Sequence, residues 1–292
     1  MEIFKTSEEL IKECIKDLFL TPKALIDKWS KITNQTSQVR IAYPGQHLAS
    51  VITGIKGEGT AARGDDLSDG SEVKTCSRVD QLGECNNCGA KVLPWQIECP
   101  LCGSKDINIK TDSHWIFPIT TEDELKLLLN KIPRIILLLF DKEDPSINFV
   151  RLRAWAIESK NDYVRQFFTD YFYNNFLKKS KEGKKPAPCN LHPLKFDFFM
   201  MKPKLIFNAN IDFDKKNVEI KYWNVKNQKP EQIPIGILNK NEIKEIFKDE
   251  ISKDFDIKEI VKNFPHVSDD KIKNLKMRKK ILKTYKEKYK RR

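Results

Sequence analysis

The chain has 292 residues, of which 40% are apolar and 10% aromatic, a composition that supports a hydrophobic core and excludes an intrinsically disordered protein. Its longest apolar run covers residues 135–140 and is far shorter than the roughly 20 residues that cross a bilayer. The N-terminus lacks the basic, apolar and small-residue segments of a secretory signal. We therefore expect a globular, cytoplasmic protein with no membrane partner.

The net charge of +12 is concentrated near the C-terminus. Residues 271–292 contain twelve Lys or Arg side chains and one acidic residue. A segment of this kind suits the phosphate backbone of DNA, where counterion release drives binding without regard to base sequence. The alternative is a solvated tail without a ligand, so this basic tail supports DNA binding only alongside other evidence.

Two helices are predicted in an N-terminal helical region, residues 1–42. Apolar residues recur at helical spacing over residues 7–20, and Thr6 and Glu9 are spaced as a capping box. A second helix is expected to begin at Thr21, because Pro22 suits the first helical turn, and to run to about residue 31.

An α/β core is predicted for residues 43–180. A helix is expected from Pro44 onward, and the apolar run over 134–140 is typical of a strand buried on both faces of a sheet. Strands and helices alternate around it, which favours an α/β architecture. The other expected elements are a strand at 115–119, a helix at 121–131, a strand at 150–157 and a helix at 162–178.

The C-terminal region, residues 189–292, is predicted to be α+β. It follows a loop at 178–188 that is rich in Lys, Gly and Pro. We expect it to bind DNA or to mediate dimerisation, with the basic tail 271–292 at its end. Its expected elements are strands at 205–213 and 218–223 and helices at 240–250 and 257–263.

The most informative segment, residues 63–74, reads Arg-Gly-Asp-Asp-Leu-Ser-Asp-Gly-Ser-Glu-Val-Lys. Its Asp-Gly pair at 69–70 predicts a β-hairpin with a three-residue loop and a left-handed glycine. In that register Asp66 lies opposite Glu72, and Lys74 points to the same face. A two-residue loop would instead place Asp65 beside Lys74.

These three side chains suit metal-dependent phosphodiester hydrolysis. Two neighbouring carboxylates repel each other and favour a hard cation such as Mg²⁺ between them. The ion would hold a phosphate and lower the pKa of an attacking water, and the ammonium group of Lys74 would stabilise charge on the phosphate. The pattern therefore predicts Asp66 and Glu72 as magnesium ligands and Lys74 as their catalytic partner. The alternative is an ordinary charged pair on a solvated hairpin.

The four cysteines between residues 81 and 105 form a CxxC–x10–CxxC pattern, with a glycine directly after each pair. Two such turns present four thiolates to a tetrahedral Zn²⁺, and a set of four cysteines leaves no open position for catalysis. The sequence therefore predicts a structural zinc site in an insert at 81–105. Its ligands are expected to be Cys85, Cys88, Cys99 and Cys102.

Other catalytic classes fit the sequence poorly. An HNH nuclease needs a catalytic histidine beside its zinc, but the four histidines are scattered at positions 47, 114, 192 and 266. Residues 54–60 have the glycine spacing of a phosphate loop, but Thr60 replaces the required lysine. The chain also lacks the G-x-S-x-G motif of α/β-hydrolases.

In combination, these motifs resemble the MamI-type restriction endonucleases of the PD-(D/E)XK nuclease superfamily, most clearly over residues 43–120. The resemblance rests on Gly-Thr at 59–60, Arg-Gly-Asp-Asp-Leu at 63–67, Asp-Gly-Ser-Glu-Val-Lys at 69–74 and Ser-Arg-Val-Asp-Gln at 77–81, followed by the cysteine pairs. One departure concerns the first acid: the superfamily has a proline before it, and this chain has Asp65.

The resemblance implies a PD-(D/E)XK core with a mixed central sheet flanked by helices and an inserted zinc loop with four cysteine ligands. It implies a bacterial type II restriction endonuclease, a homodimer that uses Mg²⁺ to hydrolyse double-stranded DNA at an interrupted palindrome of the GAT-N4-ATC kind. A companion DNA methyltransferase is implied in the same system. Asp66 and Glu72 would hold the metal, and Lys74 would orient or activate water.

Two further readings stay open. A PD-(D/E)XK nuclease can serve repair or methyl-directed cleavage, and a zinc-ribbon protein can bind DNA without catalysis. Arg63 and Arg78 flank the hairpin, so we expect them to approach DNA phosphates, although plain surface positions are the alternative.

Overall fold

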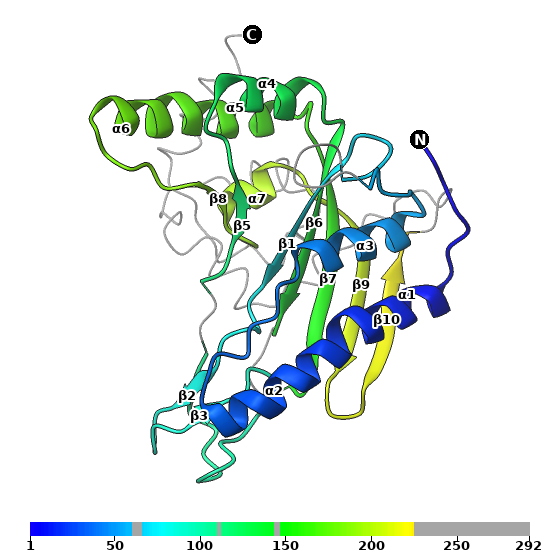
Figure 1. Cartoon of the computed structure of the whole chain (residues 1–292), viewed down its shortest axis with the longest axis vertical. Helices are drawn as coiled ribbons and strands as arrows, with labels where there is room; N and C mark the ends of the chain where they lie inside the picture. Colours follow the sequence, from blue (N-terminus) through cyan, green and yellow to red (C-terminus); the bar gives the residue numbers. More distant parts are fainter. Residues whose placement is uncertain (60–65, 110–111, 143–146, 225–292) are drawn as a thin grey trace, which may run out of the picture.

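The computed structural model describes residues 1–59, 66–109, 112–142 and 147–224. Its centre is a mixed five-stranded sheet with helices on both faces, in the order β1-β6-β7-β9-β10 (Figure 1). β1 runs parallel to β6, and all other neighbours are antiparallel. This confirms the mixed central sheet flanked by helices. The strands are β1 (Glu72–Ser77), β6 (Arg134–Asp141), β7 (Val150–Glu158), β9 (Lys204–Asp212) and β10 (Asn217–Trp223).

β6 lies inside this sheet and is buried on both faces, as its apolar run predicted. Alternate side chains enter two separate clusters: Ile135 and Leu137 belong to one, and Ile136 and Leu138 to the other. Burial of each of these aliphatic side chains contributes roughly 1.5–3 kcal/mol to the free energy of folding. β6 therefore joins the two halves of the core.

The N-terminal helices α1 (Glu8–Ile15) and α2 (Thr21–Thr33) form one continuous helix through a π-helical segment, Lys16–Leu20. The expected break before Pro22 is absent, because the wider π turn lies where the proline removes a helical donor. The predicted capping box is also wrong. Ser7 caps the helix by accepting from the Leu10 N–H at 3.2 Å, while Thr6 Oγ1 donates to the Val51 carbonyl at 2.6 Å.

α2 buries a polar face. Lys23 and Asp27 are only 7% and 5% exposed, and their charged groups are 3.2 Å apart. Lys23 Nζ also donates to the carbonyl oxygen of Ser37 at 2.6 Å and lies 5.1 Å from the ring centroid of Trp95. Burial lowers the pKa of Lys23 and raises the pKa of Asp27. Hence the buried Lys23 links α2 to the loop after it and to the cysteine-rich insert, while its ion pair with Asp27 lies within α2.

The helix α3 (Ala42–Thr53) confirms the helix expected from Pro44 and begins two residues earlier. It packs on the same face of the sheet as α1. Gly45 makes a close approach to β1 possible, since a Cβ atom at this position would lie 1.8 Å from Thr75 Oγ1. This approach brings the polar side chains of α3 to the start of β1.

The other face of the sheet carries the remaining helices and a small two-stranded sheet, β5 (Trp115–Phe117) with β8 (Cys189–Leu191). The strand at 115–119, the helix at 121–131 and the aromatic-rich helix after residue 162 are thus confirmed, although helix now extends to residue 181, into the expected loop. The helical elements are α4 (Glu122–Asn130), α5 (Asp162–Asp170), a π-helical segment (Tyr171–Leu177), α6 (Lys178–Lys181) and α7 (Phe196–Met200).

The described part of the expected C-terminal region does not form a sheet of its own. β9 pairs with β7 and β10 pairs with β9, so both strands extend the central sheet. The strands expected at 205–213 and 218–223 are thereby confirmed. The helices expected at 240–250 and 257–263 and the basic tail 271–292 lie outside the described residues. Among the helices that are described, none has the length and apolar character needed to cross a membrane.

Candidate active site and metal centre

The turn before β1 has the predicted register. Leu67 N–H donates to the Ser71 carbonyl at 3.2 Å, and Gly70 takes a left-handed φ of 83°, as expected for the three-residue loop. The described residues before the turn do not form a strand, however. β1 instead obtains its backbone partner from β6, in parallel.

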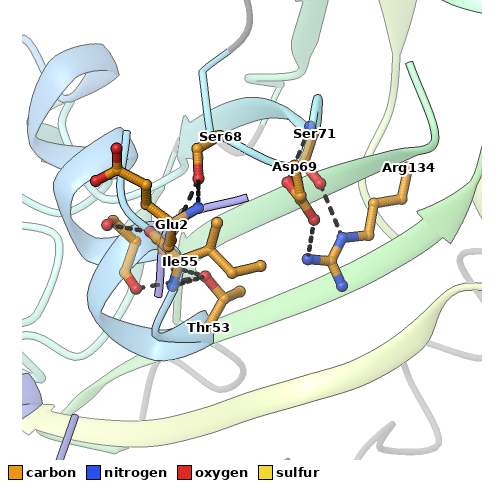
Figure 2. A network of polar contacts seen from close by, with 9 residues as sticks. Glu2, Thr53, Ile55, Ser68, Asp69, Ser71 and Arg134 are labelled. Carbon is orange, nitrogen blue, oxygen red and sulfur yellow. Dashed lines mark hydrogen bonds and ion pairs between the residues drawn. The ribbon is translucent and has the colours of Figure 1, made fainter. Parts of the chain in front are cut away.

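Two contacts fix this turn on the body of the protein. Arg134, the first residue of β6, donates from Nη2 to Asp69 Oδ2 at 2.6 Å and from Nε to Ser71 Oγ at 2.8 Å. On its other side, Ser68 Oγ accepts from the Glu2 N–H at 2.7 Å. Figure 2 shows both sets of contacts. The turn is therefore held between the start of β6 and the N-terminal segment.

Asp66 is brought to the first residues of β1 by hydrogen bonds to both of its carboxylate oxygens. Oδ2 accepts from the Val73 N–H at 2.7 Å, and Oδ1 accepts from Nε2 of Gln46 on α3. The bond to Val73 places the carboxylate against the backbone of β1, at the peptide that follows Glu72. The structure thus attaches Asp66 to the start of β1 through side-chain hydrogen bonds rather than a strand ladder.

Glu72 and Lys74 alternate along β1 and share one face, as predicted. Their side chains are in contact and are only 20% and 23% exposed. Lys74 Nζ lies 5.9 Å from the ring centroid of Phe117 on β5. Val73, between them, is 5% exposed and packs in the cluster on the opposite face. Glu72 and Lys74 therefore form a partly buried ion pair at the start of β1, the strand whose backbone Asp66 contacts at Val73.

The two arginines predicted to contact DNA have different outcomes. Arg63 lies outside the described residues, as does Asp65, the alternative to Asp66. Arg78 follows the end of β1, where its Nη2 donates to the Pro193 carbonyl at 2.9 Å. It is four residues beyond Lys74, or about 13 Å along an extended strand. Arg78 is thus separated from the acidic side chains.

The four cysteines of the insert converge. Their Sγ atoms all lie within 4.8 Å of one another, and the Cys85–Cys102 and Cys88–Cys99 pairs are each separated by 3.6 Å. Zinc–sulfur bonds of about 2.3 Å in a tetrahedron place the sulfurs about 3.8 Å apart. The thiol positions therefore fit a tetrahedral zinc ion.

The two CxxC turns of this insert have the same backbone geometry. Gly89 N–H donates to the Cys85 carbonyl at 2.8 Å, and Gly103 N–H donates to the Cys99 carbonyl at 2.9 Å. Both glycines have a left-handed φ, 72° and 70°. The backbone N–H of Ser104, with the amide of Asn87, lowers the pKa of the Cys102 thiol to about 6, whereas hydrogen bonds with the other thiols raise the pKa of Cys88 to about 12. The cluster therefore favours one thiolate, at Cys102, and a metal ion would displace the protons of the others. Three short strands frame the turns: β2 (Gly83–Cys85), β3 (Lys91–Val92) and β4 (Ile107–Asn108).

Comparison with known proteins identifies the family. The sequence model of the MamI restriction endonucleases matches residues 28–239, most of the chain. The chain belongs to the MamI restriction endonuclease family. The type II restriction enzyme MamI of Microbacterium ammoniaphilum is 30% identical over 157 residues, which cover 52% of this chain and 45% of that enzyme. The chain therefore matches less than half the length of this relative. No solved structure matches the chain.

The matched range of this MamI family member includes the turn, the acidic pair and all four cysteines. Three further residues were not found from the sequence. Gln46 holds Asp66, Arg134 holds the turn, and Phe117 lies beneath Lys74. The one available signal was Gly45, a glycine inside a helical pattern, which indicates close packing beside Gln46.

Proposed function

We propose that this chain is a type II restriction endonuclease that hydrolyses phosphodiester bonds in double-stranded DNA with Mg²⁺. The observation that carries the proposal is the placement of Asp66 against the backbone of β1 by Val73 and Gln46, on the strand that carries the partly buried Glu72–Lys74 pair. Family membership supports an endonuclease, and restriction activity is what the name of the relative from Microbacterium ammoniaphilum states.

A second Glu-x-Lys triplet in the same chain shows what distinguishes this one. On β10, Lys221 contacts Glu219 just as Lys74 contacts Glu72. The β10 pair is 43% and 56% exposed, and the residue opposite Glu219 is Asn210. The β1 pair is partly buried, and the Asp66 carboxylate accepts a hydrogen bond from the backbone of Val73, the residue between its two members. Partial burial beside a second carboxylate favours a metal site, whereas an exposed pair is a solvated surface contact.

Asp66 and Glu72 are the residues we assign to the magnesium ion. Both carboxylate oxygens of Asp66 are oriented by hydrogen bonds, and an ionised carboxylate has about four lone-pair sites, so the group suits a hard cation. When bound, the ion supplies charge to the scissile phosphate and acidifies a water molecule. Lys74 stabilises negative charge on the phosphate, and the ring of Phe117 limits its access to water.

The proposal includes assignment to the PD-(D/E)XK superfamily, with Glu72 and Lys74 on β1 of the mixed central sheet that helices flank. The same proposal includes a structural zinc ion on Cys85, Cys88, Cys99 and Cys102, a homodimer, an interrupted palindrome as the target and a companion methyltransferase in a bacterial cytoplasm. A homodimer suits this chemistry because two strands must be cut and a two-fold axis places one site on each.

The test compares Glu72→Gln with Glu219→Gln. Both variants remove the carboxylate of a Glu-x-Lys pair on a strand, so each serves as the matched control of the other. Purified proteins are incubated with unmethylated DNA of mixed sequence and Mg²⁺. We expect discrete fragments from the wild type and Glu219→Gln, and none from Glu72→Gln, which still binds DNA.

Equal cutting by the two variants would show that the assignment of Glu72 to the active site is wrong. Cutting of methylated DNA alone would favour the methyl-directed nuclease. If the wild type binds DNA without Mg²⁺ and cuts no sequence in either methylation state, the chain is a zinc-ribbon DNA-binding protein instead.

A further inference from the structure

Two histidines form a cross-strand pair on the small sheet beside β1. Trp115 on β5 pairs with Leu191 on β8 in an antiparallel register, so the next pair outward is His114 with His192. Their ring centroids are 4.9 Å apart. Trp115 and Leu191 point into the core, and because side chains alternate along strands, the histidines point to the opposite face. His114 is partly buried and His192 is exposed, so both can reach a ligand.

Arg78 lies next to this pair. Its Nη2 donates to the carbonyl of Pro193, the residue after His192. Its Nε is buried and has no hydrogen-bond partner in the described part of the chain. The Nη2 atom of Arg78 is thus held by the Pro193 carbonyl, whereas its Nε–H lacks an acceptor among the described residues. An acceptor at this position would satisfy it.

The local charge favours an anion. Burial, His114, Arg78 and Lys195 all lower the pKa of His192, and Asp197 acts in the opposite direction. Burial raises the pKa of Asp197, which disfavours its negative charge. Its carboxyl group also accepts a hydrogen bond from the Tyr163 hydroxyl. Cations thus predominate among the groups that act on His192, which disfavours a metal ion at its ring and favours an anionic oxygen.

The position relates this cluster to the proposed active site. Phe117, beneath Lys74, is three residues from His114, about 10 Å along an extended strand. That distance is the axial rise of about three nucleotides in one strand of B-DNA. Phe117 shares the inward face of β5 with Trp115, so Lys74 and the histidines lie on opposite faces of this small sheet, and a DNA backbone that contacts both must pass its edge within a few nucleotides.

From these contacts we infer that His114, His192 and Arg78 form a clamp for one backbone phosphate of the DNA, a few nucleotides from the phosphate at Lys74. The inference rests on the proposed function, since DNA must be the substrate. A phosphate is held by protonated imidazoles and by the guanidinium group. The pKa of His192 is lowered in the protein, so its protonation on binding takes up a proton and affinity for DNA rises as the pH falls.

The experiment measures DNA binding rather than cleavage. A fluorescent duplex of about 30 base pairs is titrated with His114→Gln, His192→Gln and the control His47→Gln, each in the Glu72→Gln background with Mg²⁺. His47 is exposed on α3, which packs on the other face of the sheet. Anisotropy is recorded across salt concentrations at about pH 6 and about pH 8, and thermal unfolding checks that each variant is folded.

We expect each clamp variant to lose about tenfold in affinity at about pH 6, as for one charge-assisted contact, and less than about twofold at about pH 8. The salt dependence at the lower pH should weaken by about one unit in log–log slope. The control should match the parent at both pH values.

Other outcomes overturn the inference in distinguishable ways. Clamp variants that match the control at both pH values overturn the clamp and leave the endonuclease proposal intact. A loss seen only when micromolar Zn²⁺ is added identifies a two-histidine metal site instead. Absence of DNA binding by the parent overturns the proposed function and the clamp with it.

Discussion

Gln46 donates from Nε2 to Oδ1 of Asp66, which ties the helix α3 to the first proposed magnesium ligand. The other carboxylate oxygen is held by the Val73 N–H, so Gln46 fixes the rotation of the carboxylate about that bond. Residues that orient metal ligands affect metal affinity or activity by about 10–100-fold when they are removed.

Gln46→Ala is therefore expected to raise the Mg²⁺ concentration for half-maximal cleavage by about tenfold or more, with less effect on DNA binding. Cleavage rates over a range of Mg²⁺ concentrations measure this. The neighbouring exposed residue His47 provides the control, as His47→Ala. An unchanged Mg²⁺ requirement in Gln46→Ala would contradict the orienting role.

Gly45→Ala should destabilise the protein, because the added Cβ would lie 1.8 Å from Thr75 Oγ1. Overpacking of this kind lowers the free energy of unfolding by about 1–3 kcal/mol. Urea unfolding measures the change. The double variant Gly45→Ala/Thr75→Ala removes the hydroxyl and should recover part of the loss, while the Thr75 Cβ at 2.8 Å still crowds the site. Equal stability of Gly45→Ala and the wild type would show that α3 and β1 separate readily.

The sequence was most informative where one local rule decided the structure. The apolar run at 134–140 predicted β6 because a continuous apolar run of this length is typical of a strand covered on both faces. The left-handed Gly70 fixed the register of Leu67 against Ser71. The continuous helix from α1 to α2 was not predictable, because Pro22 indicates a helix start and the π turn that accommodates it has no comparable signal.

The candidate site, too, was predictable where local spacing decided it and not where long-range packing did. The spacing of Glu72 and Lys74 places them on one face wherever β1 pairs. The contribution of Gln46 depends on how α3 crosses β1, which is set by packing between segments that are far apart in the sequence. The His114–His192 pair was also hidden, because β5 and β8 are far apart in the sequence and only the fold aligns them.

Loss of metal from the cysteine site should unfold the insert locally. Cys102→Ser, or a strong chelator, is expected to abolish zinc content and to make residues 81–105 sensitive to protease, because the three short strands have only a small apolar cluster of their own. Trp95 stacks on Phe213 at 4.7 Å, so its fluorescence should change as well. Zinc analysis and limited proteolysis measure the two effects.

Cys14→Ser is the control for this experiment, since Cys14 lies on α1 away from the other thiols. It should retain zinc and protease resistance. Full zinc content in Cys102→Ser would show that Cys102 is not a required ligand.

The buried pair Lys23–Asp27 should be much more important for stability than the exposed pair Glu8–Lys12 on the same continuous helix. Lys23→Met leaves Asp27 as an unpaired buried charge, which is expected to cost about 3–5 kcal/mol. Lys12 and Glu8 are 35% and 51% exposed with the same i,i+4 spacing, so Lys12→Met should cost less than about 1 kcal/mol. Urea unfolding of the two variants gives the comparison.

The double variant Lys23→Met/Asp27→Leu separates the cost of an unpaired charge from the value of the pair. Replacing both partners with apolar side chains removes the charge that lacks a partner, and such replacements of buried pairs are often neutral or stabilising. Here Ser37 and Trp95 also contact Lys23, so we expect the double variant to recover most, but not all, of the loss. A double variant no more stable than Lys23→Met would mean that the contacts of Lys23 with the Ser37 loop and Trp95, rather than its pairing with Asp27, hold α2 in place.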